Sequence, residues 1–162
     1  MSLKNPDPQE VLASVDDHLQ AANGLDEALK PLGFLVAFAF HHGLLSTAFM
    51  SEHADIASRM RLQEGRVSEL FARHGGTLRR QDLTPSGQAF IHKYLPFYMQ
   101  DFVQTFADEG YAVKDSWDNY QRLAKVLIRR LRGAPNPGLV NSKTGIGGAI
   151  SKLGSLLGRL WQ

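Results

Sequence analysis

The sequence contains no cysteine among its 162 residues. This absence excludes disulfide bonds, thiolate metal ligands and cysteine nucleophiles. An apolar signal segment is also missing, because residues 1–8 mix polar side chains with two prolines. We therefore expect synthesis in the cytoplasm without export through the general secretory pathway. The length suits one domain with an appendage, and the 43% of hydrophobic residues is enough to build a buried core.

Acidic residues are absent after Asp118. Residues 119–162 carry eight Lys and Arg with no Asp or Glu, whereas residues 1–118 carry ten Lys and Arg against sixteen Asp and Glu. An acidic body is thus joined to a basic C-terminal part. Charge segregated in this way indicates an anionic partner.

Charged residues are also absent from residues 31–50. Twenty residues without Asp, Glu, Lys or Arg are about the length that crosses a bilayer. The triplet His41-His42-Gly43 interrupts this run, and a buried core helix explains the same composition. Both interpretations stay open at this stage.

Hydrophobic periodicity predicts an all-α body over residues 1–132, a compact bundle of about five or six helices without convincing strands. The first helix is expected to follow Asp7-Pro8 and to stop at Asn23-Gly24. Its apolar stripe comprises Val11, Leu12, Val15, Leu19 and Ala22. A second helix is expected from near Asp26 to just before Pro31. For residues 34–40 we favour a helix over a buried strand, since no neighbouring segment supplies a pairing strand.

Three longer helices are expected in the second part of the body. One opens at Ser51 and closes at Gly75-Gly76. The next starts at Thr84-Pro85, and Pro96 should kink it or divide it. Its aromatic residues at helical spacing indicate core, with a ligand pocket between helices as the alternative; they are Phe90, Tyr94, Phe97, Tyr98, Phe102 and Phe106. The last helix carries Asp115 and Asp118 in its first turn and ends before Gly133.

Prolines and glycines after the last helix predict a linker over residues 133–145, followed by a basic amphipathic helix over residues 146–162. On a helical wheel the apolar side chains of this tail occupy an arc of about 140°, opposite the basic and polar ones. The residues expected to bind a membrane or a partner are Ile146, Ile150, Lys152, Leu153, Leu157, Arg159, Leu160 and Trp161.

The opening Gly145-Ile146-Gly147 and the composition that follows resemble the short cationic membrane-active peptides that begin Gly-Ile-Gly. The resemblance implies affinity for a membrane surface, and we do not extend the lytic activity of those peptides to this chain. Three interpretations of the tail stay open: binding to an anionic membrane, docking in the groove of a partner protein, and packing on the body as a last core helix.

Four cations crowd the end of the last predicted helix and form a candidate phosphate-binding cluster. They are Lys125, Arg129, Arg130 and Arg132. Stabilisation of the helix dipole by cations near its C-terminus explains the same pattern.

Residues 79–87 read Arg-Arg-Gln-Asp-Leu-Thr-Pro-Ser-Gly. They resemble the basic wing and the following helix start of winged-helix regulators of the multiple-antibiotic-resistance repressor type. The resemblance implies DNA binding, while a simple helix cap explains the same residues.

Histidine and carboxylate spacing predicts neither a metal site nor a catalytic pair. His41 and His42 are adjacent, and His53, His74 and His92 fit no ligand spacing typical of zinc or of metal-binding bundles. The acidic doublets are Asp16-Asp17, Asp26-Glu27 and Asp108-Glu109, and each is expected on a solvated helix end. We expect no cofactor and no metal.

The sequence therefore favours a non-enzymatic helical adaptor, effector or regulatory protein, of bacterial type, that associates with an anionic membrane surface through its tail. A soluble interaction module of immunity or chaperone type is the alternative, in which the acidic body or the tail docks on a protein partner. A DNA-binding regulator is the third. The expected location is the cytoplasm, peripheral to a membrane.

Overall fold

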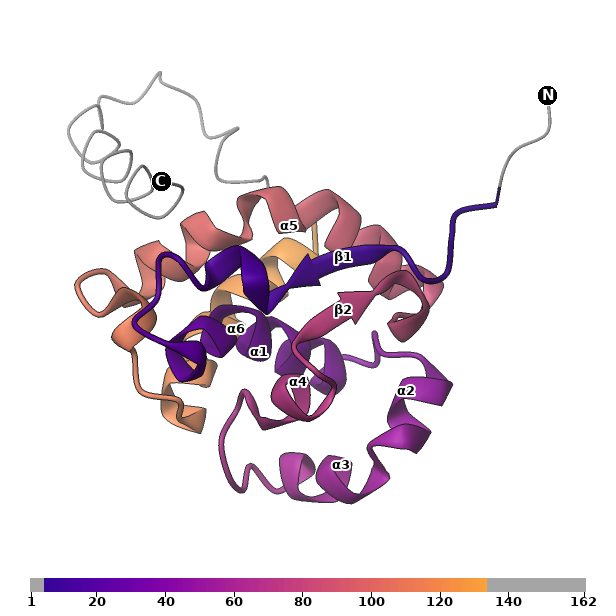
Figure 1. Cartoon of the computed structure of the whole chain (residues 1–162), viewed down its shortest axis with the longest axis horizontal. Helices are drawn as coiled ribbons and strands as arrows, with labels where there is room; N and C mark the ends of the chain where they lie inside the picture. Colours follow the sequence, from indigo (N-terminus) through magenta and orange to yellow (C-terminus); the bar gives the residue numbers. More distant parts are fainter. Residues whose placement is uncertain (1–4, 134–162) are drawn as a thin grey trace.

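The computed structural model describes residues 5–133, so the predicted linker after Gly133 and the predicted C-terminal helix lie outside the described residues. Within this range the chain folds into a mostly helical bundle with a small two-stranded sheet, which confirms the predicted all-α class (Figure 1). The elements are β1 (Val11–Ser14), η1 (Val15–His18), α1 (Leu25–His41), α2 (Thr47–Glu52), α3 (Ala54–Arg61), α4 (Glu69–Arg73), β2 (Thr77–Arg79), η2 (Arg80–Asp82), α5 (Pro85–Phe106), η3 (Gly110–Ala112) and α6 (Trp117–Leu131).

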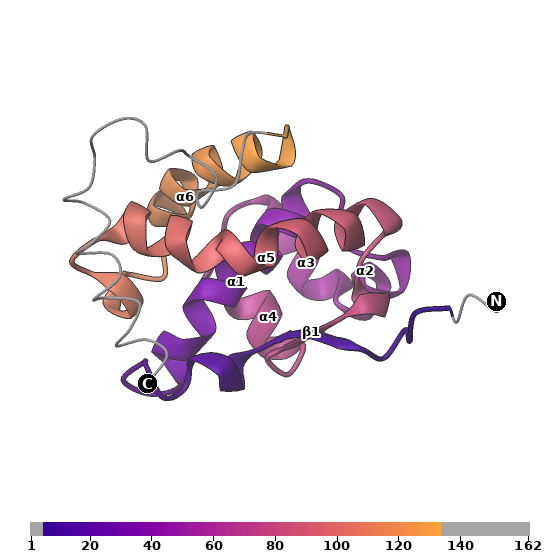
Figure 2. The same cartoon turned by 90° about the horizontal axis from the view of Figure 1, so that it is seen from above.

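Helix α1 runs through the centre of the body and contacts α4, α5 and α6 (Figures 1 and 2). Its side chains from Ala28 to Phe40 are buried with the exception of the half-buried Lys30. A helix that is apolar around its whole circumference needs neighbours on every side. The preference for a helix over residues 34–40 is therefore confirmed.

The apolar run over residues 31–50 is not one element, since α1 ends at His41 and α2 begins only at Thr47. None of the helices within residues 5–133 combines the length and the apolar character that a membrane span needs. The expected helix end before Pro31 is wrong, because α1 continues through this residue. Proline removes only its own N–H, the donor to the Glu27 carbonyl oxygen. The hydroxyl of Tyr98 donates to the Pro31 carbonyl oxygen, so α5 contacts α1 at this residue.

The expected first helix is also wrong, because residues 11–14 form strand β1. This strand pairs antiparallel with β2, with Ala13 opposite Leu78 and a bulge between Val11 and Ala13. Asp7 does not cap a helix; its carboxylate accepts from the backbone N–H of Gln9 in a local turn. Ala13 is the one buried residue of this strand, Leu12 and Ser14 are half-buried, and Val11, on the other side of the bulge, is exposed.

The long helix expected from Ser51 to Gly75 is wrong. Ser51 lies inside α2, which begins at Thr47, and two further helices, α3 and α4, follow it. Gln63 and Gly65 between α3 and α4 have positive φ angles of 55° and 74°, which a continuous helix does not allow. Gly75 and Gly76 do end α4, with φ angles of 85° and 71°.

Helix α5 begins where the sequence predicts, whereas α6 begins at Trp117, so Asp118 but not Asp115 lies in its first turn. The Thr84 hydroxyl accepts from the Gly87 N–H at the start of α5, and Pro85 occupies the first turn. Helix α5 continues past Pro96 and is not divided. Ser116 caps α6 by accepting from the Asn119 N–H. The aromatic series of α5 lies in the core, where Phe90, Tyr94, Tyr98, Phe102 and Phe106 are buried and Phe97 is half-buried.

Gly33 sets the distance between α1 and α4. A Cβ atom at this position would lie 2.5 Å from the Cβ of Ser68 and 2.7 Å from its Cα. Ser68 is itself fixed, because its N–H donates to the Asp115 carboxylate over 3.2 Å and its hydroxyl donates to the same carboxylate.

We expect Gly33→Ala to lower the free energy of unfolding by about 1–3 kcal/mol, the usual cost of overpacking, because α1 and α4 must move apart. Gly43→Ala is the control: nothing lies within 4 Å of its added Cβ, and its φ of +66° carries only a backbone cost, about 1 kcal/mol. Urea unfolding followed by circular dichroism measures both. A Gly33→Ala protein as stable as the wild type would contradict the close approach.

His18 joins the N-terminal segment to η3. Its Nδ1 atom lies 2.7 Å from the hydroxyl oxygen of Tyr111, and both side chains are buried. Burial lowers the pKa of His18 below its ordinary value of 6.5, against the opposing effect of Asp17. Burial also raises the pKa of Tyr111 to about 12.

The lowered pKa of His18 predicts a loss of stability in mild acid. The unfolded chain binds this proton more readily than the folded one, so the contribution of neutral His18 is complete above about pH 6.5 and falls as the pH drops toward the lowered value. In His18→Gln the free energy of unfolding should decline less steeply between about pH 7 and pH 5. The decline should not vanish, because burial also lowers the pKa of His41 and His42. Equal slopes in the two proteins, measured by urea unfolding, would contradict this role.

Candidate anion-binding surface

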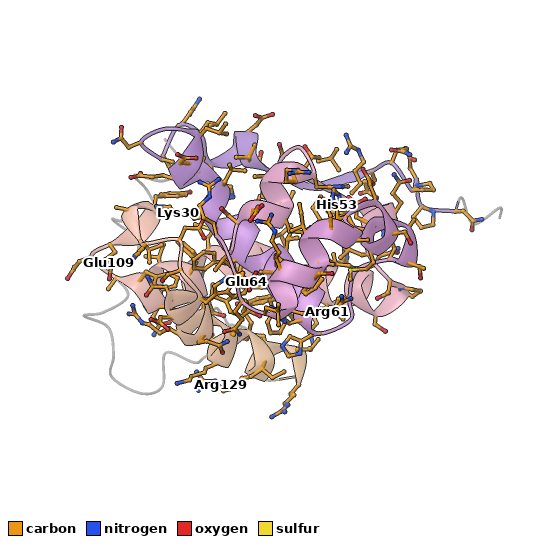
Figure 3. All side chains as sticks on the ribbon, turned by 90° about the horizontal axis from the view of Figure 1, so that it is seen from below. Lys30, His53, Arg61, Glu64, Glu109 and Arg129 are labelled. Carbon is orange, nitrogen blue, oxygen red and sulfur yellow. The ribbon has the colours of Figure 1, made fainter. Side chains whose placement is uncertain are left out.

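Four cations lie on one face of α6 at intervals of three, four and three residues. They are Arg122, Lys125, Arg129 and Arg132, and all are exposed. At 100° per residue they fall within an arc of about 80°. We call these four residues the basic face of α6. Figure 3 shows Arg129 pointing outward at the edge of the molecule.

The basic face borders an open groove of about 520 Å³ between α5 and α6, which run side by side (Figure 2). Arg122, Lys125 and Arg129 line it from α6, and Gln104 and Thr105 line it from α5. Asp101 also lines the groove, and its carboxylate is already paired with Arg130. The groove therefore combines exposed cations with neutral hydrogen-bonding groups and one neutralised carboxylate, a set that suits anionic oxygen ligands.

The cations of the basic face differ in whether their side chains form hydrogen bonds within the protein. Arg122 donates to the Asn119 side chain over 3.0 Å and to the Thr105 carbonyl oxygen over 3.1 Å. The side chains of Lys125, Arg129 and Arg132 make no hydrogen bond or ion pair with any residue of the described range. An anionic partner can therefore bind these three without first breaking an internal bond.

Arg130 belongs to the predicted basic cluster but faces the core. Its Nε donates to Asp101 Oδ2 over 2.8 Å and its Nη2 donates to Oδ1 over 3.0 Å. The hydroxyl of Tyr94 donates to the same carboxylate. The hydrogen bond to Asp101 raises the pKa of Arg130, and burial followed by the hydrogen bond to Asp101 raises that of Tyr94. Arg130 thus ties α6 to α5.

The structure therefore divides the cluster predicted from sequence. Lys125, Arg129 and Arg132 come together on one face, while Arg130 has a structural position. Arg122 was missed, although its spacing of three and seven residues from Lys125 and Arg129 was a readable signal. The eight tail residues predicted to bind a membrane or partner, from Ile146 to Trp161, lie outside the described residues.

Residues 79–87, which resemble part of a winged-helix regulator, form hydrogen bonds within the body. The Nε of Arg80 donates to the Glu10 carboxylate over 2.8 Å, and the backbone N–H of Arg79 donates to Asp82 over 2.7 Å. Thr84 caps α5. The helix-cap interpretation thus accounts for this segment.

Two histidines far apart in sequence meet at the other end of the body. His53 Nε2 lies 2.9 Å from His74 Nδ1, and His74 Nε2 lies 3.0 Å from Asp82 Oδ2. His53 separates α2 from α3, and His74 caps the C-terminus of α4. His53 is nevertheless buried, with 7% of its surface exposed. Burial, followed by the proximity of His74, lowers the pKa of His53.

Residues 14–114, more than half of the chain, match a protein family whose description reads "Domain of unknown function (DUF7832)". The chain belongs to this family. No curated protein and no solved structure matches it. The matched range contains the histidine pair and Asp82 and stops before α6, so the basic face lies outside the part that matches the DUF7832 family.

Asp101→Asn should lower the free energy of unfolding of this DUF7832 protein by about 3–5 kcal/mol, the usual cost of removing one partner of a buried ion pair. The carboxylate is 2% exposed and receives both Arg130 and Tyr94. Asp118→Asn on the exposed side of α6 is the control and should lower stability by no more than about 1 kcal/mol, because it removes only a favourable charge at the start of the helix. Thermal and urea unfolding give both values. Equal stability of the two variants would show that the pair is not a structural tie.

Proposed function

We propose that this protein is a non-enzymatic adaptor or regulator that binds an anionic membrane surface peripherally. The observation that carries the proposal is the basic face of α6, with three exposed cations that have no partner within residues 5–133. A row of cations near anionic headgroups gains about 1 kcal/mol for each residue. The face is therefore suited to orient the body on the membrane.

The position of the basic face in the chain supports a membrane partner. Helix α6 is the last described helix, and the predicted amphipathic segment begins only 15 residues after its end at Leu131. Headgroup attraction alone gives weak and reversible binding, and stable attachment requires a second, apolar contribution. We propose that Ile150, Leu153, Leu157 and Trp161 supply it by entering the acyl boundary while the basic face meets the headgroups.

A second candidate is a protein partner for the acidic end of the body. Asp16, Asp17 and Asp26 are exposed in η1 and in the first turn of α1, and Glu27 lies beside them at half exposure. Exposed carboxylates at this density attract a basic surface and raise the rate of association. In this alternative the protein is an interaction module, and high salt should weaken capture of the partner.

Vesicle sedimentation tests the membrane proposal. The intact chain should pellet with vesicles that contain anionic lipid and remain in the supernatant with neutral ones. The triple variant Lys125→Gln, Arg129→Gln, Arg132→Gln should bind at least about tenfold more weakly. Each replaced cation contributes up to about 1 kcal/mol to the binding free energy. Replacing Leu153, Leu157 and Trp161 by Ser should weaken binding further, since apolar burial is lost.

A matched control distinguishes the effect of the basic face from the effect of the protein's net charge. Arg61→Gln, Lys93→Gln and Lys114→Gln remove the same charge from exposed residues outside α6 and should leave vesicle binding nearly unchanged. A duplex DNA and an acidic protein serve as competing ligands. Equal recovery of all variants in the supernatant with excess anionic lipid would overturn the proposal. A preference for DNA over vesicles would favour the regulator instead.

A further inference from the structure

The histidine pair, the exposed Glu52 and Asp82 form a cluster that the basic face does not explain. Figure 3 shows His53 and Arg129 on separate parts of the molecule. His53 Nε2, His74 Nδ1 and a carboxylate oxygen of Glu52 all lie within 4.8 Å of one another. The three ligand atoms come from the end of α2, the start of α3 and the end of α4. Glu52 and His53 are neighbours in the chain, and tertiary folding brings His74 to them.

Hydrogen bonding fixes which ring nitrogens face each other. Asp82 Oδ2 is an acceptor, because it also receives the Arg79 N–H over 2.7 Å, so His74 Nε2 carries a proton. The Nδ1 atom of neutral His74 then holds a lone pair, and His53 Nε2 donates to it over 2.9 Å. One proton thus lies between two imidazole nitrogens, in the position that a cation shared by both lone pairs would take.

The distances suit a transition metal. Nitrogen ligands bind zinc at 2.0–2.1 Å in a tetrahedral arrangement, which separates two ligand atoms by about 3.3 Å. The imidazole nitrogens are 2.9 Å apart, and Glu52 Oε1 is 4.0 Å from His53 Nε2. The two nitrogens must move apart by about 0.4 Å, and the Glu52 carboxylate, which lies within 4.8 Å of both, must approach them by up to about 1.5 Å to reach tetrahedral spacing. Glu52 can move this far, since 66% of its side-chain surface is exposed.

Asp82 supplies the carboxylate that typically orients a metal-binding histidine. Metal-binding histidines typically donate their second ring N–H to a carboxylate, which orients the ring and strengthens the ligand. His74 makes this bond to Asp82 over 3.0 Å. The ring of Phe49 packs against both imidazoles, with centroid distances of 4.8 Å and 4.4 Å. The two rings are therefore held in place before any ligand binds.

Charge favours a divalent cation at the same point. Two neutral imidazoles with Glu52 and Asp82 give a formal charge of −2 around the cluster, which a divalent cation neutralises. The nearby Arg73 does not oppose this, because its charge is paired with Asp55 over 3.6 Å. Binding releases no net proton: the proton on His53 Nε2 leaves that nitrogen, and His53 takes up a proton at Nδ1 instead.

We propose that His53, His74 and Glu52 bind a divalent transition metal of the zinc class, with Asp82 orienting His74. Three protein ligands leave the fourth tetrahedral position to solvent or to a ligand, as in zinc sites that bind exogenous groups. The metal would also join the α2–α3 corner to the end of α4 in place of a single hydrogen bond.

Metal titration of the untagged, full-length chain tests this site. Calorimetry with ZnCl₂ should show one saturable site, and Co²⁺ should give the visible absorption of a tetrahedral complex. The predicted tail cannot supply competing side-chain ligands, because residues 119–162 contain no His, Cys, Asp or Glu. Zinc should also raise the melting temperature relative to protein treated with a chelator.

Variants locate the site. His74→Gln and His53→Gln should abolish the saturable binding, Glu52→Gln should weaken it about tenfold or more, and Asp82→Asn should weaken it 10–100-fold. His92→Gln, which alters an exposed histidine of α5, is the control and should bind like the wild type. Glu52→Gln remains informative if a buried histidine variant fails to fold, because Glu52 is exposed. Absence of saturable zinc binding by the wild type overturns the proposal, as does binding that is unchanged in both His74→Gln and Glu52→Gln.

Discussion

Burial of α1 on all sides is the constraint on which the rest of the structure depends. A helix whose residues are apolar around its whole circumference can be stable in water only if other elements cover every face. Gly33 has no side chain, so α4 can approach α1 closely. The hydroxyl of Tyr98 on α5 donates a hydrogen bond to the carbonyl oxygen of Pro31. Tyr120, Leu123 and Leu127 of α6 close another side. The need to bury the apolar side chains of α1 therefore determines where the other helices lie.

This arrangement also decides which cations of α6 are available. A helix that buries Leu123 and Leu127 turns the residues on its opposite face to solvent, and Lys125 and Arg129 follow from that geometry. Arg130 lies between the two faces and reaches the Asp101 carboxylate on α5. Arg130 thus fixes α6 against α5, and this fixed position of α6 orients the exposed cations of the basic face. The structural tie and the candidate binding surface are two sides of one helix.

The sequence predicted the parts of this protein that local chemistry determines. The cap at Thr84 and the helix over residues 34–40 were readable, because each depends on neighbours within a few residues. Strand β1 was not, because its pairing partner lies more than 60 residues away in β2. The breaks around His53 and Gly65 were missed as well, since the apolar periodicity continues across them. The histidine pair has no spacing signal at all, because 21 residues separate its members.

The breaks that the periodicity concealed are also what create the histidine cluster. Had residues 51–73 formed one helix, a rise of 1.5 Å per residue would have placed His53 and His74 about 30 Å apart. The non-helical dihedral angles of His53 and the positive φ of Gln63 and Gly65 fold this segment back on itself. The cluster thus occurs where local propensity and tertiary structure disagree, which is where functional sites are expected. The basic face of α6 has the opposite origin, because its regular spacing along one helix needs no long-range contact. The two surfaces therefore have independent physical origins, and a substitution that removes one would leave the other in place.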